Sequence, residues 1–317
     1  MGEHSQWKPI GEVTTQATSG VTKRAQVKTK TRKTENIVFI GSEMDYDLFW
    51  LKMMFVGAAY KFANTSLRTA SRSVIAYVNI GYERAERLAI EGLANGLGAE
   101  IIPIGKPGDV QNILGRDRDS YELLDVAFFC HGLVGSLDLD YAGPKGIKIT
   151  STTFNGVRQD AFSSGGRLFS FACRTGNGEP SLIKDQMGFA NDQDCRPKQS
   201  LAQFIADHFD IEVHAFLKRS FYGNVLRSQS DSKRIADLLK MQRDHNSGGI
   251  IDLPPDHEAI PHPGLADSGI DWPFLKKGPK GEGTNDYSLW RKKGGISIPS
   301  SAETPKGLSS GLKTFEK

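Results

Sequence analysis

Short apolar runs alternate along this chain with longer segments in which apolar residues recur at helical spacing. The apolar runs predict strands that begin near residues 36, 73, 99, 126, 168 and 211. The segments with helical spacing predict helices over 48–62, 83–97, 107–114, 151–162, 199–209 and 229–243. Because strands and helices alternate, we expect a three-layer α/β fold with a mostly parallel central sheet and helices on both faces.

Composition divides the chain into three expected parts. Residues 1–35 are polar and basic without periodicity, so we expect a flexible leader. Residues 36–247 carry the alternating pattern and are expected to form the folded domain. From residue 248 to 317 the pattern dissolves into Gly, Pro, Lys and Ser, which indicates a C-terminal extension. Its tryptophans, Trp272 and Trp290, favour packing of this extension against the folded domain.

Two of the apolar runs end in residues that are able to do chemistry. The run 126–130 leads into His131 and Gly132, and the run 168–172 leads into Cys173. Since the carboxyl ends of parallel strands share one edge of a sheet, we expect the imidazole and the thiol at the same edge. A thiol needs a base to become a nucleophilic thiolate, and His131 is placed to be that base. The backbone N–H groups of Gly132 and Cys173 are the expected oxyanion hole, so acyl transfer is the natural chemistry.

The two motifs are Phe129-Cys130-His131-Gly132 and Ala172-Cys173-Arg174-Thr175-Gly176. Together they resemble the motifs of the caspase-like cysteine peptidases, and among these the bacterial CHAT domains most closely. The resemblance covers roughly residues 36–226 and implies a caspase-like fold with a dyad, in which His131 is the general base and Cys173 the nucleophile. Caspases have Gln-Ala-Cys where this chain has Phe171-Ala172-Cys173, so their specificity for aspartate is not carried over.

Two other interpretations stay open. Histidine and cysteine also occur as ordinary core residues at the ends of strands, and the protein would then be a noncatalytic caspase-like interaction module. Alternatively, Cys173 followed by His214 reproduces the residue order of papain-like amidases. In those folds the cysteine opens a helix, whereas here an apolar strand precedes Cys173 and glycines follow it.

Carboxylates gather in the two loops that we expect beside the proposed dyad. Asp45 and Asp47 follow the first strand, together with Glu43, and Asp192 and Asp194 follow the cysteine. A carboxylate binds Arg or Lys strongly in a partly dehydrated pocket. We therefore expect a protein or peptide substrate that is cleaved after a basic P1 residue.

Further expectations concern the segments around the motifs. Residues 137–143 and 147–150 resemble a hairpin of the CHAT branch, in which Asp138 and Asp140 alternate and are expected to face solvent. Residues 174–198 are rich in Gly and Pro without a clear period, which predicts a long loop.

Composition also bears on the cellular compartment and on the partners that we expect. Three cysteines without paired spacing favour a reducing compartment. Without a signal peptide or an apolar segment of about 18 residues, a cytoplasmic protein with no membrane partner is expected, although secretion by a signal-less route would leave no trace. The formal charge is +3, and basic residues cluster in the leader over 23–33 without interleaved aromatic residues. Nucleic acid is therefore not an expected partner, whereas a regulatory protein is. No phosphate loop or metal-ligand spacing is present, and we expect neither a cofactor nor a metal.

Overall fold

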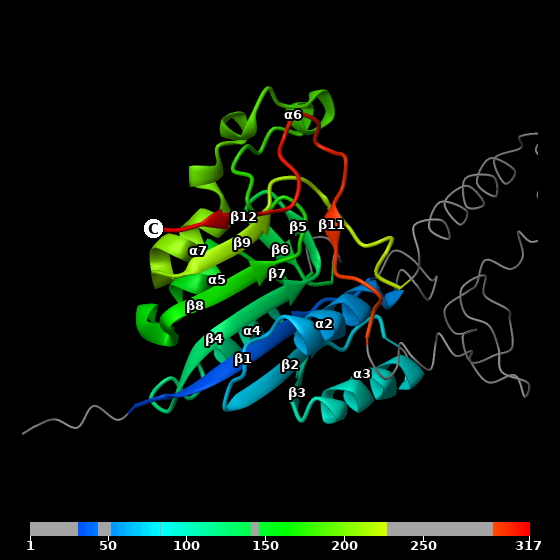
Figure 1. The fold of residues 1–317 in the computed structure, drawn as a ribbon, viewed down its shortest axis with the longest axis vertical. Coiled ribbons are helices and arrows are strands. Elements are labelled where there is room, and N and C mark those ends of the chain that lie inside the picture. The colour runs from blue at the N-terminus through cyan, green and yellow to red at the C-terminus, as the bar shows by residue number, and fades with distance from the viewer. Residues whose placement is uncertain (1–30, 44–51, 83, 141–145, 227–293) are drawn as a thin grey trace, which may run out of the picture. The chain divides into compact units, whose positions relative to one another are not determined.

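A mostly parallel β-sheet lies at the centre of the protein, of which the computed structural model describes residues 31–43, 52–82, 84–140, 146–226 and 294–317 (Figure 1). Its strands are β1 (Lys33–Ile40), β2 (Arg72–Val78), β3 (Glu100–Ile104), β4 (Tyr121–Phe129), β8 (Phe162–Ser170), β9 (Glu212–Phe216) and β12 (Leu312–Phe315). Their order is β12-β9-β8-β4-β1-β2-β3, and β12 alone is antiparallel to its neighbour. The predicted α/β class and the mostly parallel sheet are confirmed.

Helices cover both faces of this sheet because its central strands are apolar on both sides. Along β1, Ile37 and Phe39 enter one core, whereas Val38 and Ile40 enter the other. Successive side chains of a strand point to opposite faces, so a continuous apolar run needs a cover on each. The helices α2 (Met54–Thr65) and α3 (Arg84–Gly96) pack on the side of Val38. On the opposite side lie α4 (Pro107–Gly115), α5 (Ser151–Asn155) and α7 (Leu201–Phe209).

Some elements differ from the sequence pattern in length or type. The helix expected over 151–162 ends at Asn155, and a single 3₁₀ turn, η2 (Gln159–Ala161), precedes β8. The expected long loop after the cysteine contains the short helix α6 (Leu182–Met187) and the 3₁₀ turns η3 (Asp192–Cys195) and η4 (Pro197–Gln199). Local hydrogen bonds stabilise these turns; for example, the Asn191 side chain accepts a bond from the Gln193 N–H. Residues 1–30 of the expected leader (1–35) and the helix expected over 229–243 lie outside the described residues, whereas residues 33–35 of that leader belong to β1.

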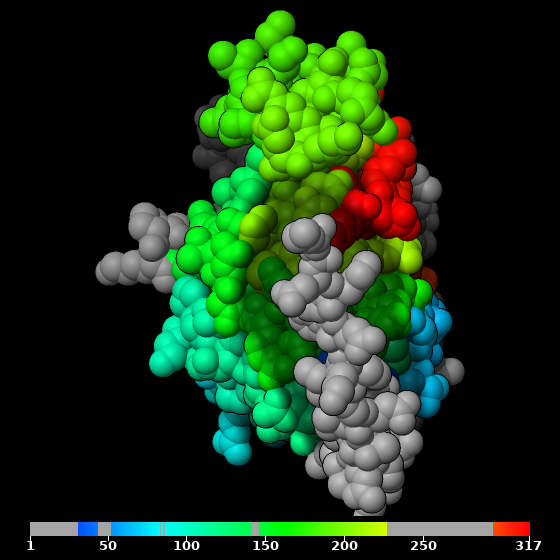
Figure 2. All heavy atoms as spheres, turned by 90° about the vertical axis from the view of Figure 1, so that its left-hand side faces the viewer, coloured from blue at the N-terminus to red at the C-terminus, as the bar shows by residue number. Residues whose placement is uncertain are grey.

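The last residues of the chain complete the sheet. Strand β12 pairs with the edge of β9, and β11 (Ser300–Ser301) pairs with β10 (Ser220–Phe221). In the space-filling view of Figure 2, the red C-terminal residues lie directly against the yellow-green surface that contains α7 and β9. The sequence assigned these residues to an extension, because a strand of four residues is too short to produce a clear period. Its pairing with β9 covers what would otherwise be an open sheet edge.

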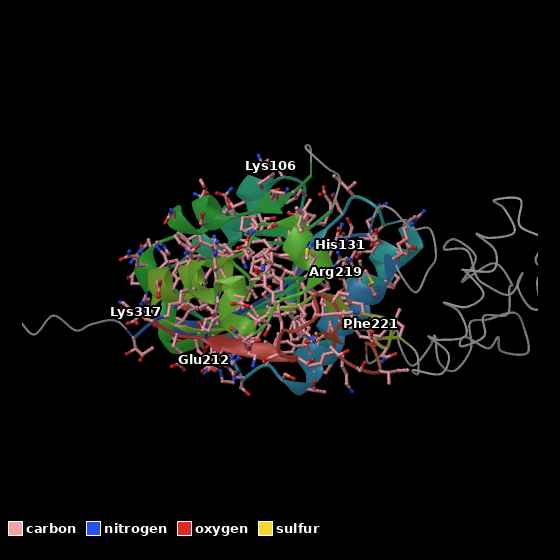
Figure 3. All side chains as sticks on the ribbon, turned by 90° about the horizontal axis from the view of Figure 1, so that it is seen from above. Lys106, His131, Glu212, Arg219, Phe221 and Lys317 are labelled. Carbon is pink, nitrogen blue, oxygen red and sulfur yellow. The ribbon has the colours of Figure 1, made fainter. Side chains whose placement is uncertain are left out.

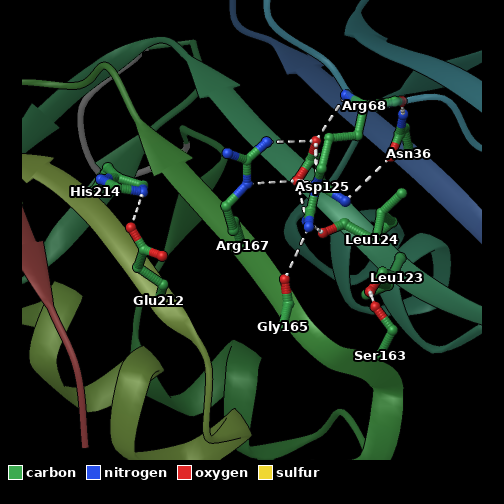
Figure 4. Close-up of polar contacts among 10 residues, drawn as sticks. All are labelled: Asn36, Arg68, Leu123, Leu124, Asp125, Ser163, Gly165, Arg167, Glu212 and His214. Atoms are coloured by element: carbon green, nitrogen blue, oxygen red, sulfur yellow. Dashed lines mark hydrogen bonds and ion pairs between the residues drawn. The ribbon is translucent and has the colours of Figure 1, made fainter.

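Two partly exposed arginines pair with a buried aspartate near the amino ends of the strands (Figure 4). Asp125 in β4 has no exposed surface and accepts two hydrogen bonds of 3.0 Å from Arg167, with further bonds from Arg68. Burial by itself raises the pKa of Asp125, but the guanidiniums of Arg167 and Arg68 outweigh this effect and lower that pKa. This network lies away from the edge at which the two sequence motifs end.

Candidate active site

The two motifs meet at the carboxyl edge of the sheet. Strands β4 and β8 are parallel neighbours, and the chain continues from them into His131 and Cys173. His131 opens a small antiparallel sheet of β5 (His131–Leu133), β6 (Ser136–Asp138) and β7 (Lys148–Ile149). A Cβ atom on Gly132 would lie 2.6 Å from the Cys173 carbonyl oxygen and 3.0 Å from its nitrogen. The glycine therefore allows the two backbones to touch.

The imidazole of His131 is held by a buried carboxylate. Its Nε2 atom lies 2.7 Å from Oε2 of Glu43. Glu43 is 1% exposed and lies in the segment that follows β1. Phe55 of α2 packs edge-on against the imidazole, with ring centroids 5.0 Å apart. About a quarter of the His131 side chain reaches solvent, since 23% of it is exposed. The ring is thus oriented from two sides while part of it stays accessible.

The Cys173 thiol contacts Ser220, the first residue of β10. Its Sγ atom lies 3.2 Å from Ser220 Oγ, and the Ser220 N–H donates to the sulfur over 3.3 Å. Among the described residues the sulfur is hydrogen-bonded to Ser220 rather than to His131. Figure 3 shows His131 at the same end of the molecule as Arg219 and Phe221, the neighbours of Ser220.

Cys173 differs from the other two cysteines in exposure. Cys130 and Cys195 are buried, whereas Cys173 is partly exposed. Burial raises the pKa of Cys195 to about 12 and raises the pKa of Cys130 well above its ordinary value. Both are therefore thiols at neutral pH without nucleophilic character.

The carboxylates expected to bind substrate serve other contacts. Asp192 accepts a hydrogen bond of 2.7 Å from the Ser309 N–H and pairs with Lys313. Burial opposes ionisation of Asp192, but the bonds from Ser309 and Lys313 prevail and lower its pKa. Asp194 accepts a bond from the Ala190 N–H within its own turn. Both side chains thus organise the segment around η3, while Asp45 and Asp47 lie outside the described residues.

The alternative partner, His214, lies in the middle of β9 and away from the thiol. Its Nε2 atom is 2.7 Å from Glu212 (Figure 4). Its Nδ1 atom is 3.3 Å from the Thr314 hydroxyl, and its ring stacks on Phe169. Burial lowers the pKa of His214, so the neutral ring is favoured. Figure 3 places Glu212 at the opposite end of the molecule from His131. The geometry therefore gives no support to a pairing of Cys173 with His214.

The hairpin after His131 is present, but its aspartates do not face solvent. Asp138 is 4% exposed and accepts a hydrogen bond of 2.9 Å from the Ser136 hydroxyl. Asp140 is 3% exposed and accepts a bond of 2.7 Å from the Ile147 N–H. The expectation of exposure is wrong because both faces of this hairpin are covered, which alternation along one strand cannot reveal.

A pocket of about 200 Å³ opens beside the two motifs. Leu133 and Val134, which come shortly after His131 in the sequence, line this pocket. Arg174, which follows Cys173 directly, also lines it. The rest of the lining comes from the segment that contains α6, namely Asn177, Glu179, Pro180, Ser181, Leu182, Asp185 and Phe189. Both halves of the candidate site thus contribute to one wall.

The sequence pattern does not indicate the structural role of two residues in this site, Glu43 and Ser220. Glu43 was grouped with the carboxylates expected to bind substrate, and its partnership with His131 depends on the neighbouring positions of β1 and β4. Ser220 lies in an unremarkable polar stretch, and only the folded chain brings it to Cys173. A correct strand order would have suggested that Glu43 lies near His131, because β1 adjoins β4 in the sheet. No local sequence signal indicates that Ser220 contacts Cys173.

The fold and the site define an α/β protein with a candidate thiol–imidazole centre at the carboxyl edge of its sheet. No protein-family model matches the chain, and no curated protein matches it. Within the described ranges, no three or more His, Cys, Asp or Glu side chains are grouped so that they could hold a metal ion. In the same part of the chain, no helix is long and apolar enough to cross a membrane.

Proposed function

We propose that this protein is a caspase-like cysteine endopeptidase of the CHAT type, with Cys173 as nucleophile and His131 as general base. The observation that carries the proposal is the contact of the Gly132 and Cys173 backbones beside an imidazole that a buried carboxylate orients. A partly exposed thiol and a fixed imidazole on adjoining loops are what nucleophilic catalysis by cysteine requires.

In the proposed reaction, the carboxylate of Glu43 accepts the Nε2–H of His131, and Nδ1 is then the atom that takes the thiol proton. The sulfur attacks the peptide carbonyl carbon and forms the C–S bond. Backbone N–H groups of Gly132 and Cys173 stabilise the negative charge on the carbonyl oxygen. The C–N bond then breaks, the imidazolium gives its proton to the leaving amine, and water hydrolyses the thioester with His131 again as base.

The contact of the thiol with Ser220 favours the thiolate but holds the sulfur away from the imidazole. The Ser220 N–H and hydroxyl face the sulfur, where they stabilise negative charge. For proton transfer, however, the sulfur must turn from Ser220 toward the imidazole. Catalytic hydrogen bonds are often long or misaligned without substrate and shorten in the complex.

An electrophilic peptide probe tests the dyad. The wild-type protein is expected to be labelled on Cys173, and both Cys173→Ala and His131→Ala are expected to abolish labelling while their thermal unfolding stays that of a folded protein. Matched controls are Cys195→Ala, a buried thiol, and His214→Phe, a histidine in β9, and both are expected to keep labelling. Undiminished labelling of either dyad variant would overturn the proposal.

A second candidate function is the noncatalytic interaction module, which the hydrogen bond between Cys173 and Ser220 favours. In that case the Cys173 thiol is only a structural hydrogen-bond partner of Ser220, and neither the wild type nor Ser220→Gly reacts with the probe. Labelling of the wild type, or labelling that appears only in Ser220→Gly, excludes a site without reactive chemistry.

A further inference from the structure

The pocket beside the dyad carries more acidic than basic side chains. Three charged residues line it, the carboxylates of Glu179 and Asp185 and the guanidinium of Arg174. Arg174 and Asp185 form a buried ion pair of 3.0 Å, in which each side chain is 10% exposed. With that pair neutral, Glu179 leaves the lining with one negative charge in excess.

The cations that balance these carboxylates from outside the lining are exposed. Glu179 pairs with Arg196, whose side chain is 55% exposed, whereas that of Glu179 is 11% exposed. Asp185 also pairs with Arg219, which is 50% exposed. Water screens such half-exposed partners, so they cost little to displace. A cation that enters the pocket itself meets the carboxylates in drier surroundings.

Asp185 has an acceptor atom to spare. Its Oδ2 atom takes both guanidiniums, while its Oδ1 atom is buried without a hydrogen-bond partner among the described residues. An ionised carboxylate has about four acceptor sites on its two oxygens, and a buried acceptor without a donor is costly. A ligand that brings N–H donors would satisfy it.

The remaining walls suit the stem of a long basic side chain. Leu133, Val134, Leu182 and Phe189 supply apolar surface around the carboxylates. Lysine and arginine bury their methylene stems against apolar surface and keep a charged head at a polar group. At about 200 Å³ the pocket is smaller than the roughly 300–1,000 Å³ of sites for drug-sized ligands, and it fits a single side chain.

We infer that this pocket is the P1 subsite, that it takes arginine or lysine, and that Glu179 and Asp185 determine the specificity. The inference rests on the proposed peptidase function and names Glu179 and Asp185 in place of Asp192 and Asp194, which do not line this pocket. The position of Arg174 next to Cys173, and of Leu133 close after His131, places the pocket where a P1 side chain would enter.

Peptide substrates that differ only at P1 test the subsite in the active protein. We expect kcat/KM to be higher for P1 Arg and Lys than for P1 Leu and Glu. Glu179→Gln and Asp185→Asn are each expected to lower kcat/KM for P1 Arg by about 10- to 100-fold, the effect of one charge-assisted bond, and to leave P1 Leu unchanged. Asp194→Asn, an exposed carboxylate of the same segment, is the matched control and is expected to change neither.

A binding measurement separates failure of the subsite from failure of the peptidase. The Cys173→Ala protein is titrated with N-acetyl-arginine amide and N-acetyl-leucine amide, and the arginine compound is expected to bind more tightly. Glu179→Gln is expected to remove that difference. This variant leaves the ion pair between Arg174 and Asp185 intact, so it tests the subsite even if Asp185→Asn does not fold. Equal binding of the two compounds, or a preference that survives Glu179→Gln, would overturn the subsite even if the probe labels Cys173. Absence of labelling in the wild-type protein, with arginine binding to Cys173→Ala intact, would overturn the peptidase alone.

Discussion

At the scale of single residues, the structure gives each member of the proposed dyad a partner. Glu43 orients the imidazole, and Ser220 faces the sulfur. A carboxylate bound to a histidine fixes its tautomer and stabilises the imidazolium that forms during proton transfer. Glu43 is therefore a positioning residue in the proposed mechanism, since it acts through His131.

Glu43→Gln is expected to lower kcat/KM by about 10- to 100-fold. The amide keeps an acceptor for the imidazole but loses the charge, and a charge-assisted hydrogen bond contributes about 1.5–3 kcal/mol. Steady-state kinetics across pH measures both the size of the loss and any change in the pH profile, which a merely structural role would not move.

The control for this change is Glu100→Gln. Glu100 is a half-exposed carboxylate that pairs with Arg116 at the amino end of the strands, away from the candidate site. The control variant is expected to leave kcat/KM unchanged. Activity of Glu43→Gln within twofold of the wild type would show that the carboxylate does not assist His131.

At the scale of elements, the site depends on how closely two strand-end loops approach. The backbone after β4 rests on the backbone after β8, and Gly132 is the point of contact. Two parallel neighbours bring their carboxyl ends together, but only a residue without Cβ lets them touch. The spacing of the dyad is thus a property of the pair of strands.

Gly132→Ala is expected to destabilise the protein by about 1–3 kcal/mol, the usual cost of overpacking, and to reduce labelling of Cys173. Its Cβ atom would lie 2.8 Å from the Ala172 Cβ atom, so the loops must separate. Urea unfolding and probe labelling measure the two effects.

Gly92→Ala is the matched control, because Gly92 lies inside α3 and a Cβ atom there meets nothing within 4 Å. Alanine in a helix interior is expected to stabilise by about 0.5–1 kcal/mol. If Gly132→Ala changed the unfolding free energy and the labelling of Cys173 no more than Gly92→Ala does, the close contact at Gly132 would not be needed for the site.

At the scale of the whole molecule, the end of the chain supports the loop that carries the cysteine. Phe315 of β12 is 5% exposed, and its ring packs closely on Gly176. A Cβ atom on Gly176 would lie only 2.7 Å from the Phe315 ring. Gly176 belongs to the segment that follows Cys173. Residues 312–315 therefore close the sheet and brace the candidate site together.

Phe315→Ala is expected to cost about 3 kcal/mol of unfolding free energy, at the lower end for a core phenylalanine because β12 is an edge strand. Labelling of Cys173 is expected to fall as the supporting ring is lost. Lys317→Ala, which removes an exposed pair with Asp210, is the control and is expected to cost less than 1 kcal/mol. A loss below 1 kcal/mol in Phe315→Ala would mean that β12 contributes little to the fold.

Local patterns in the sequence determined the strands, the layers and the two strand-end motifs. Apolar runs such as 126–130 and 168–172 identify strands because burial on both faces leaves no polar position in them. The placement of His131 and Cys173 at one edge follows from the same reasoning, since parallel strands end together.

The partners of those residues were decided by tertiary structure alone. Glu43, Ser220 and β12 reach the site from segments far apart in the chain, and no periodicity encodes which strands become neighbours. The burial of Asp138 and the contacts of Asp192 likewise depend on what packs over each loop. Hydrophobic periodicity reports which side of an element is apolar, whereas contacts between loops arise only once the strands are ordered in the sheet.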